Sequence, residues 1–273
     1  MAIRIPLAGL LVLLVCLPAA ARDRSGSRPD DTWSVGTWSL GPYLATYAGP
    51  THDDLLAYTN RIMAVNQSDP DRRFEDLPTG VPAGLRLWWK AGSLLAFSAT
   101  YGFSRYSTEA TFTPFEWESR REMAVNLHEL TVAVHHGLAF LRGSAADPYV
   151  GVGVNVYVAD SEYTIGLRNV YGVTEDGDVM SDHDVAMSSM DWTAGPVALA
   201  GITYHLSPRV AVNGEFQGLM GQVRQHFDYE GSLPYIVPNY NPDDPLKVND
   251  VLQGAYPMDL NGIRLSVSLL ISL

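Results

Sequence analysis

The last twelve residues of the chain alternate between two kinds of side chain. Apolar residues occupy every second position, at Ile263, Leu265, Val267, Leu269, Ile271 and Leu273, and mostly small or polar residues lie between them. Five valines alternate in the same way over residues 150–158. A period of two is typical of a β-strand whose two faces meet different environments. The pattern predicts an all-β protein but leaves open which face points inwards.

Strand length separates a membrane barrel from a soluble sandwich. A tilted strand needs about 9–11 residues to cross a bilayer, whereas strands of soluble proteins more often have about 5–6 residues. Most of the predicted strands reach the longer value. We place eight of them at residues 38–47, 80–89, 94–106, 123–141, 149–162, 191–206, 210–221 and 258–273.

The connections between these strands are sorted by length. The second, fourth and sixth links have 4, 7 and 3 residues and are rich in Gly, Ser and Pro, as tight turns require. The other links, at residues 48–79, 107–121, 163–190 and 222–257, have 15 to 36 residues. Short turns at one end and long loops at the other are typical of outer-membrane barrels. We therefore predict an antiparallel up-and-down transmembrane β-barrel with eight strands, apolar outside and polar inside.

Two of the long links carry further signals. Residues 51–66 begin with Thr-His-Asp-Asp and continue with apolar residues at helical spacing. They predict a short helix in the first long loop, folded over the barrel mouth, with a lid or plug as the alternative. The last link contains Tyr235, Ile236 and Val237, which could belong to a further hairpin. A ten-stranded barrel is therefore the alternative to eight strands.

The chain is acidic, with 18 Lys and Arg against 30 Asp and Glu. Phosphate contacts need basic side chains, so we expect no nucleic-acid partner. The four long links hold 19 of the acidic and 8 of the basic residues, which places most of the negative charge in the predicted outer loops. The predicted strands are nearly neutral in sum, as contact with lipid requires.

The N-terminus has the three parts of a signal peptide. Arg4 precedes an apolar run over residues 7–17, and small residues precede a predicted cleavage after Ala21. Residues 1–21 would be removed, residues 22–37 would form an N-terminal tail, and residues 38–273 would form the barrel domain. Cys16, the only cysteine, lies in the signal peptide, so disulfides and thiolate metal sites are excluded from the predicted mature chain.

The signal peptide, the final alternating strand and the rhythm of short and long links resemble the small outer-membrane barrels of the OmpA and OmpW type. The resemblance covers most of residues 38–273 and concerns the architecture. It implies that both termini lie in the periplasm and the long loops outside. We expect a monomer in the outer membrane of a Gram-negative-type bacterium. Its expected partners are outer-membrane lipid, lipopolysaccharide and, during biogenesis, the barrel-assembly machinery.

Four charged residues fall on the predicted lumen faces, namely Arg86, Glu129, Glu215 and Arg264. A narrow barrel lets side chains meet across its axis, and buried charges are tolerated only when they are paired. We interpret the four residues as a polar network that packs the lumen. The alternative is a gated, narrow ion path through that network. Trp88, on the same predicted face, would fill space in the lumen.

The histidine and acidic clusters do not favour a metal site. Three histidines lie on the fourth predicted strand, at His128, His135 and His136. Alternation points only His135 into the lumen, and side chains of adjacent strand residues diverge, whereas a metal site needs convergent ligands. The acidic residues between 175 and 184 do not match the spacing of an EF-hand. We therefore expect no metal and no cofactor.

The leading interpretation is an outer-membrane barrel with a structural or surface-interaction role and no catalysis. A narrow channel for small solutes or hydrophobic compounds is the first alternative. The second is a lipid-modifying barrel enzyme, because His52, His183 and His226 lie in the outer loops near Ser and Asp residues. No nucleophile motif such as G-x-S-x-G is present, but catalytic triads are recognised by geometry and not by sequence position.

Overall fold

The computed structural model describes residues 35–48, 81–112, 117–141, 145–169, 183–226, 228–230 and 256–273. Strands dominate these residues, together with one short 3-10 helix, η2, at Ala139–Leu141. The strands are β1 (Trp38–Ala48), β2 (Ala83–Lys90), β3 (Leu95–Phe112), β4 (Trp117–Gly137), β5 (Ala146–Asn169), β6 (His183–His205), β7 (Val210–Leu219), β8 (Gln222–Gln225), β9 (Asp228–Glu230), β10 (Tyr256–Asp259) and β11 (Gly262–Ser272). Among the described residues, no helix is long and apolar enough to cross a membrane.

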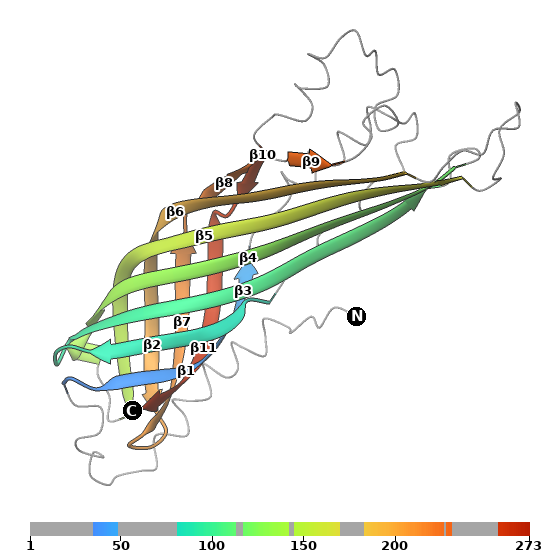
Figure 1. The fold of residues 1–273 in the computed structure, drawn as a ribbon. Helices are drawn as coiled ribbons and strands as arrows, with labels where there is room; N and C mark the ends of the chain where they lie inside the picture. The colour runs from blue at the N-terminus through green and yellow to red at the C-terminus, as the bar shows by residue number, and fades with distance from the viewer. Residues whose placement is uncertain are drawn as a thin grey trace, which may run out of the picture.

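The main sheet closes on itself (Figure 1). Each strand from β1 to β6 pairs with the next one along the chain, and β7 pairs with β11. The ladder between β1 and β11, which starts at Ser39 and Ser272, completes the ring. All these pairings are antiparallel. The structure therefore confirms the predicted antiparallel barrel with eight strands.

The short strands β8 and β10 continue β7 and β11 beyond a break. Val223 of β8 pairs with Met258 of β10, in the same register as the ladder between β7 and β11. At the break, the Leu260 amide donates to the carbonyl of Gly221 over 2.9 Å. The Gly221 amide donates to the side-chain oxygen of Asn261 over 3.0 Å. In the described residues, β8 and β10 thus lengthen two existing strands and do not add a ninth and tenth to the barrel.

The apolar face of the alternating strands points outwards. On β5, Val152 is 61% exposed whereas Asn155 and Tyr157 are fully buried. On β11, Ile271 is 45% exposed whereas Ser268 is buried. Water would disfavour such a wide apolar exterior, but hydrocarbon around the barrel would not. On these strands, the residues that the sequence pattern assigns to the outer face are therefore those that face outwards in the structure.

Strands β3 to β6 are longer than the sequence predicts. Residues 107–121 and 163–190 were expected as loops, but β3 continues to Phe112, β4 begins at Trp117, β5 continues to Asn169 and β6 begins at His183. The prediction was wrong because it ended these strands close to the point where the apolar alternation ends. Backbone pairing needs no apolar face and continues beyond that point. In Figure 1 these four strands extend past the barrel, away from the short turns.

The short links lie close to their predicted places. β2 ends at Lys90 and β3 begins at Leu95, while β6 ends at His205 and β7 begins at Val210. The fourth strand ends earlier than expected, at Gly137, because the 3-10 helix η2 follows it.

The chain enters the barrel through a turn at Gly36. This residue has a φ of 95°, in the left-handed region that favours glycine. Its amide donates to the carbonyl of Lys90 over 2.7 Å, which joins the last residues of the predicted N-terminal tail to β2. The predicted signal peptide, residues 22–34 of the tail, the predicted helix at 51–66 and residues 235–237 lie outside the described residues.

The orientation of the faces predicts how two arginine substitutions differ. Val152→Arg puts a charge on the apolar exterior and should destabilise the barrel by about 2–4 kcal/mol if that site lies near the bilayer midplane. Glu162→Arg, on the exposed part of β5 beyond the apolar band, should change stability by about 0.5 kcal/mol or less. Urea unfolding in lipid vesicles measures both. Equal effects would mean that Val152 does not face lipid.

Candidate functional site in the barrel lumen

The four charged residues predicted for the lumen come from four strands and all lie inside. Arg86 is on β2, Glu129 on β4, Glu215 on β7 and Arg264 on β11, and each is 3% exposed or less. Each lies at an inward-facing position of its strand. The structure brings them together as two ion pairs across the barrel.

The first pair joins Arg86 and Glu215. Arg86 Nη2 lies 2.6 Å from Glu215 Oε1. The guanidinium also donates through Nε to Thr100 Oγ1 over 2.9 Å and through Nη1 to Asn213. The second carboxylate oxygen of Glu215 accepts from the Tyr149 hydroxyl over 2.8 Å. Both charged groups are thus hydrogen-bonded on several sides, which buried charges require.

The second pair joins Arg264 and Glu129. Arg264 Nη1 donates to Glu129 Oε2, and the other carboxylate oxygen accepts from the Tyr47 hydroxyl. Arg264 Nη2 donates to Thr131 Oγ1 over 3.0 Å. The two side chains are each 1% exposed, so this pair is as fully desolvated as the first.

Gln217 connects the two pairs. Its amide nitrogen donates to Glu215 Oε1, and its carbonyl oxygen accepts from Arg264 Nε over 2.7 Å. The ring of Tyr43 lies 5.5 Å from the guanidinium carbon of Arg86 and 5.9 Å from that of Arg264. One network therefore runs across the lumen from Thr100 to Tyr47. We name it the lumen network, made of Tyr43, Tyr47, Arg86, Thr100, Glu129, Thr131, Tyr149, Asn213, Glu215, Gln217 and Arg264.

An aromatic layer separates this network from the short-turn end. The Trp88 ring stacks on His135 at 4.3 Å between centroids and lies 5.3 Å from Tyr149. His135 Nε2 lies 2.7 Å from Ser98 Oγ. Trp88 and His135 are 6% and 1% exposed, so both fill the lumen.

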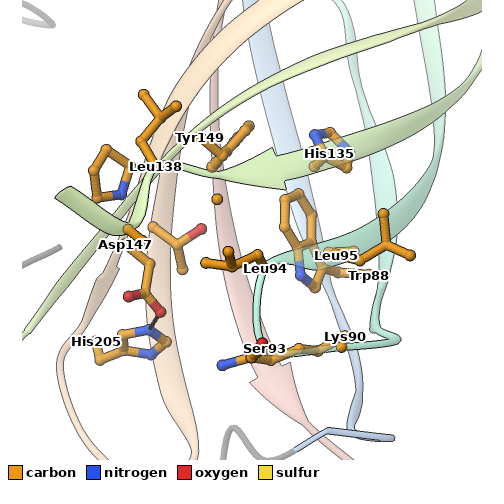
Figure 2. A pocket seen from close by; sticks show the side chains of 16 residues that line it. Trp88, Lys90, Ser93, Leu94, Leu95, His135, Leu138, Asp147, Tyr149 and His205 are labelled. Carbon is orange, nitrogen blue, oxygen red and sulfur yellow. Dashed lines mark hydrogen bonds and ion pairs between the residues drawn. The ribbon is translucent and has the colours of Figure 1, made fainter. Parts of the chain in front are cut away.

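A cavity of about 60 Å³ lies beside this layer, among residues of the short turns. Figure 2 shows the rings of Trp88, His135 and Tyr149 on one side and Asp147 with His205 on the other. His205 Nε2 lies 3.1 Å from Asp147 Oδ2. An engineered cavity of about 150 Å³ holds a benzene ring, so this one is too small for a drug-sized ligand.

The three histidines of β4 have separate surroundings. His135 is in the lumen, whereas His128 is on the outer face, where its Nδ1 lies 2.8 Å from the Tyr101 hydroxyl. His136 is exposed. Within the described ranges, no three His, Cys, Asp or Glu side chains are arranged to hold a metal ion. Residues 170–182 of the acidic loop lie outside those ranges.

Of the three rim histidines, only His226 has a described side chain. Its Nδ1 lies 3.4 Å from Asp191 Oδ2, and its backbone amide donates to the same oxygen over 2.7 Å. Ser189 Oγ also donates to Asp191, over 3.1 Å. The serine therefore contacts the carboxylate and not the imidazole, unlike the nucleophile of a catalytic triad. His52 and the side chain of His183 lie outside the described residues.

The neutral members of the lumen network were not singled out from the sequence. The signal for them was present, because Tyr43, Asn213 and Gln217 all occupy the inward parity of alternating strands. An inward position on a strand does not identify the partner of a side chain. Arg86 and Glu215, for example, meet across two intervening strands, β1 and β11.

No protein-family model matches the chain, and no curated protein matches it in sequence. Among solved structures, the fold is similar to that of the outer membrane protein OprG from Pseudomonas aeruginosa, with 10% identity, a TM-score of 0.45, and coverage of 88% of this chain and 96% of OprG. It is also similar to Ail, the attachment invasion locus protein of Yersinia pestis (7% identity, TM-score 0.36, 88% and 97% coverage). CarO of Acinetobacter baumannii is a third (13% identity, TM-score 0.36, 86% and 97% coverage). These likenesses concern the fold alone.

The burial of the ion pairs predicts strong coupling between partners. Arg264→Met or Glu129→Met alone leaves one buried charge without its partner and should destabilise the barrel by about 3–5 kcal/mol. The double variant should recover much of this loss, because apolar side chains of similar volume replace both charges. Unfolding by urea, analysed as a double-mutant cycle, measures the coupling.

Arg120 provides the matched control. It pairs with Glu109 over 2.8 Å on the outer face, where both side chains are about half exposed. Arg120→Met should therefore change stability by about 0–1 kcal/mol. A loss for Arg264→Met no larger than this would contradict a desolvated lumen network.

Proposed function

We propose that this chain is an outer-membrane barrel with a closed lumen and a structural or surface-interaction role, without catalysis. The observation that carries the proposal is the lumen network, whose four charged groups are 3% exposed or less and hydrogen-bonded to one another across the barrel. A lumen crossed by packed, paired side chains is a core and not a water-filled pore. The apolar exterior supports insertion in a membrane.

The length of β3 to β6 supports a role at the surface. These strands have 18, 21, 24 and 23 residues, about twice what a bilayer crossing needs. The excess lies at the end opposite the short turns (Figure 1). In an outer membrane with short turns in the periplasm, this extension would stand outside the cell.

A narrow channel stays the second candidate, for a specific reason. Four buried hydroxyls of β1 and β11 have no hydrogen-bond partner among the described residues, and three of them, those of Tyr43, Ser266 and Ser268, lie at inward positions near the lumen network. Buried polar groups without a protein partner commonly bind ordered water. Water at these positions would lie beside the lumen network, where a small rearrangement could open a path.

The membrane location is tested first. Cells expressing the chain are fractionated, and the fractions are run on SDS gels with and without boiling. We expect a faster band in the unboiled sample, confined to the outer-membrane fraction, because a closed barrel resists SDS. A soluble periplasmic protein without a mobility shift would contradict the proposal.

Conductance in planar bilayers then separates the closed barrel from the channel. The purified barrel should give no discrete openings. A variant with Glu129→Ala and Arg264→Ala, which removes the second ion pair, should conduct if it folds, because the lumen loses one of its largest buried side chains, Arg264, together with the carboxylate that pairs with it. Regular openings of the unaltered protein would favour the channel. Altered lipid A in mass spectra of cells with the protein would contradict the absence of catalysis.

A further inference from the structure

The outer face of β3 to β6 changes character between two adjacent rows of paired residues. One row runs across the four strands through Phe103, His128, Val158 and Trp192. The next row, two residues further from the short turns, runs through Arg105, Asn126, Asp160 and Met190. Aromatic side chains mark the membrane interface of barrels. We therefore place the boundary between hydrocarbon and headgroups near this change of row, with Phe103 and Trp192 on its apolar side.

A polar hollow of about 470 Å³ lies directly beyond the boundary. The floor of the hollow is formed by three small side chains on neighbouring strands. Ser107 of β3 pairs with Ala124 of β4, and Thr164 of β5 lies one row further along. Longer charged side chains surround them. These are Arg105, Glu109, Arg120, Glu122 and Glu162.

The charged residues around the hollow are only partly neutralised. Arg120 lies 2.8 Å from Glu109 and 2.7 Å from Glu122, so these three form a fixed group. Arg105 and Glu162 are exposed and make no ion pair with any described residue. The hollow thus offers one free guanidinium, one free carboxylate and several hydroxyls to a ligand.

This set of groups suits a phosphorylated sugar. Carboxylates accept hydrogen bonds from sugar hydroxyls, and a guanidinium donates to hydroxyl or phosphate oxygens. A benzene ring of six heavy atoms occupies a cavity of about 150 Å³, so a hexose phosphate of about sixteen heavy atoms needs about 400 Å³. One sugar unit with a phosphate therefore fits the hollow.

We propose that this hollow binds the phosphorylated sugar headgroup of a glycolipid of the outer leaflet. The inference rests on the proposed location in the outer membrane. The position favours a lipid over a soluble sugar, because Arg105 is two residues, or about 7 Å along the strand, from Phe103 in the interfacial row. A headgroup whose acyl chains contact the apolar band would reach the hollow without leaving the membrane surface.

The test compares variants for the glycolipid that they retain. The full-length protein is reconstituted in vesicles with lipopolysaccharide, or with phosphatidylglycerol in its place, extracted in mild detergent and analysed by native mass spectrometry. Ala124→Trp fills the floor without changing the charge, and Arg105→Gln with Glu162→Gln removes the two free charges. Arg209→Gln, an exposed arginine in the turn at the opposite end, is the matched control.

We expect both test variants to retain lipopolysaccharide at least fivefold less than the unaltered protein, and Arg209→Gln to retain it equally. Unchanged retention by Ala124→Trp in a sample with the normal gel shift would overturn the proposal. Equal retention of phosphatidylglycerol would overturn the sugar specificity. Full displacement by soluble core oligosaccharide at equal concentration would overturn the membrane source. A missing gel shift in the unaltered protein would instead contradict the proposed function itself.

Discussion

The ladder between β1 and β11 is the contact on which the other features depend. In hydrocarbon, an unpaired backbone N–H or C=O costs several kcal/mol, so a sheet can span a membrane only if it has no edges. Here the first and last barrel strands meet along most of their length, from Ser39 and Ser272 to Ala48 and Ile263. Closure fixes two faces for every strand, and each side chain then lies either in the lumen or towards the surroundings.

Closure also explains why the lumen holds charges. Eight strands enclose a space that side chains can just fill, and many apolar residues of these strands point outwards. The inward positions hold apolar and aromatic side chains such as Leu127 and Trp88 together with polar and charged ones, and the buried charges must be paired. Arg86 pairs with Glu215 and Arg264 with Glu129, and Gln217 links them, so no charge in the lumen network is left without a partner. The paired charges stabilise the barrel. Removing one member of a pair leaves the other as a buried charge without a partner, which is unfavourable.

The sequence predicted the parity of residues better than their contacts. A strict period of two is a local property, so Arg86, Glu129, Glu215 and Arg264 could all be assigned to the lumen from their own strands. The pairing of Arg86 with Glu215 depends on barrel radius, strand tilt and the register of the three ladders that connect β2 to β7 through β1 and β11, and no local pattern records these. The same limit applies to Tyr43, whose place between two guanidiniums follows only from the closed ring.

The strand ends were missed for a different physical reason. Along β5, the outward residues change from Val154, Val156 and Val158 to Asp160, Glu162 and Thr164, while the pairing with β4 and β6 continues without interruption. The pattern of outward side chains depends on the medium around the barrel, whereas strand pairing depends on hydrogen bonds with the backbone of the neighbouring strand. The side chains on the outer face of one strand can therefore change from those that suit hydrocarbon to those that suit headgroups and water. The side-chain pattern shows these changes but does not show where the strand ends. On β5 the apolar pattern therefore ends after Val158, whereas the strand itself continues to Asn169.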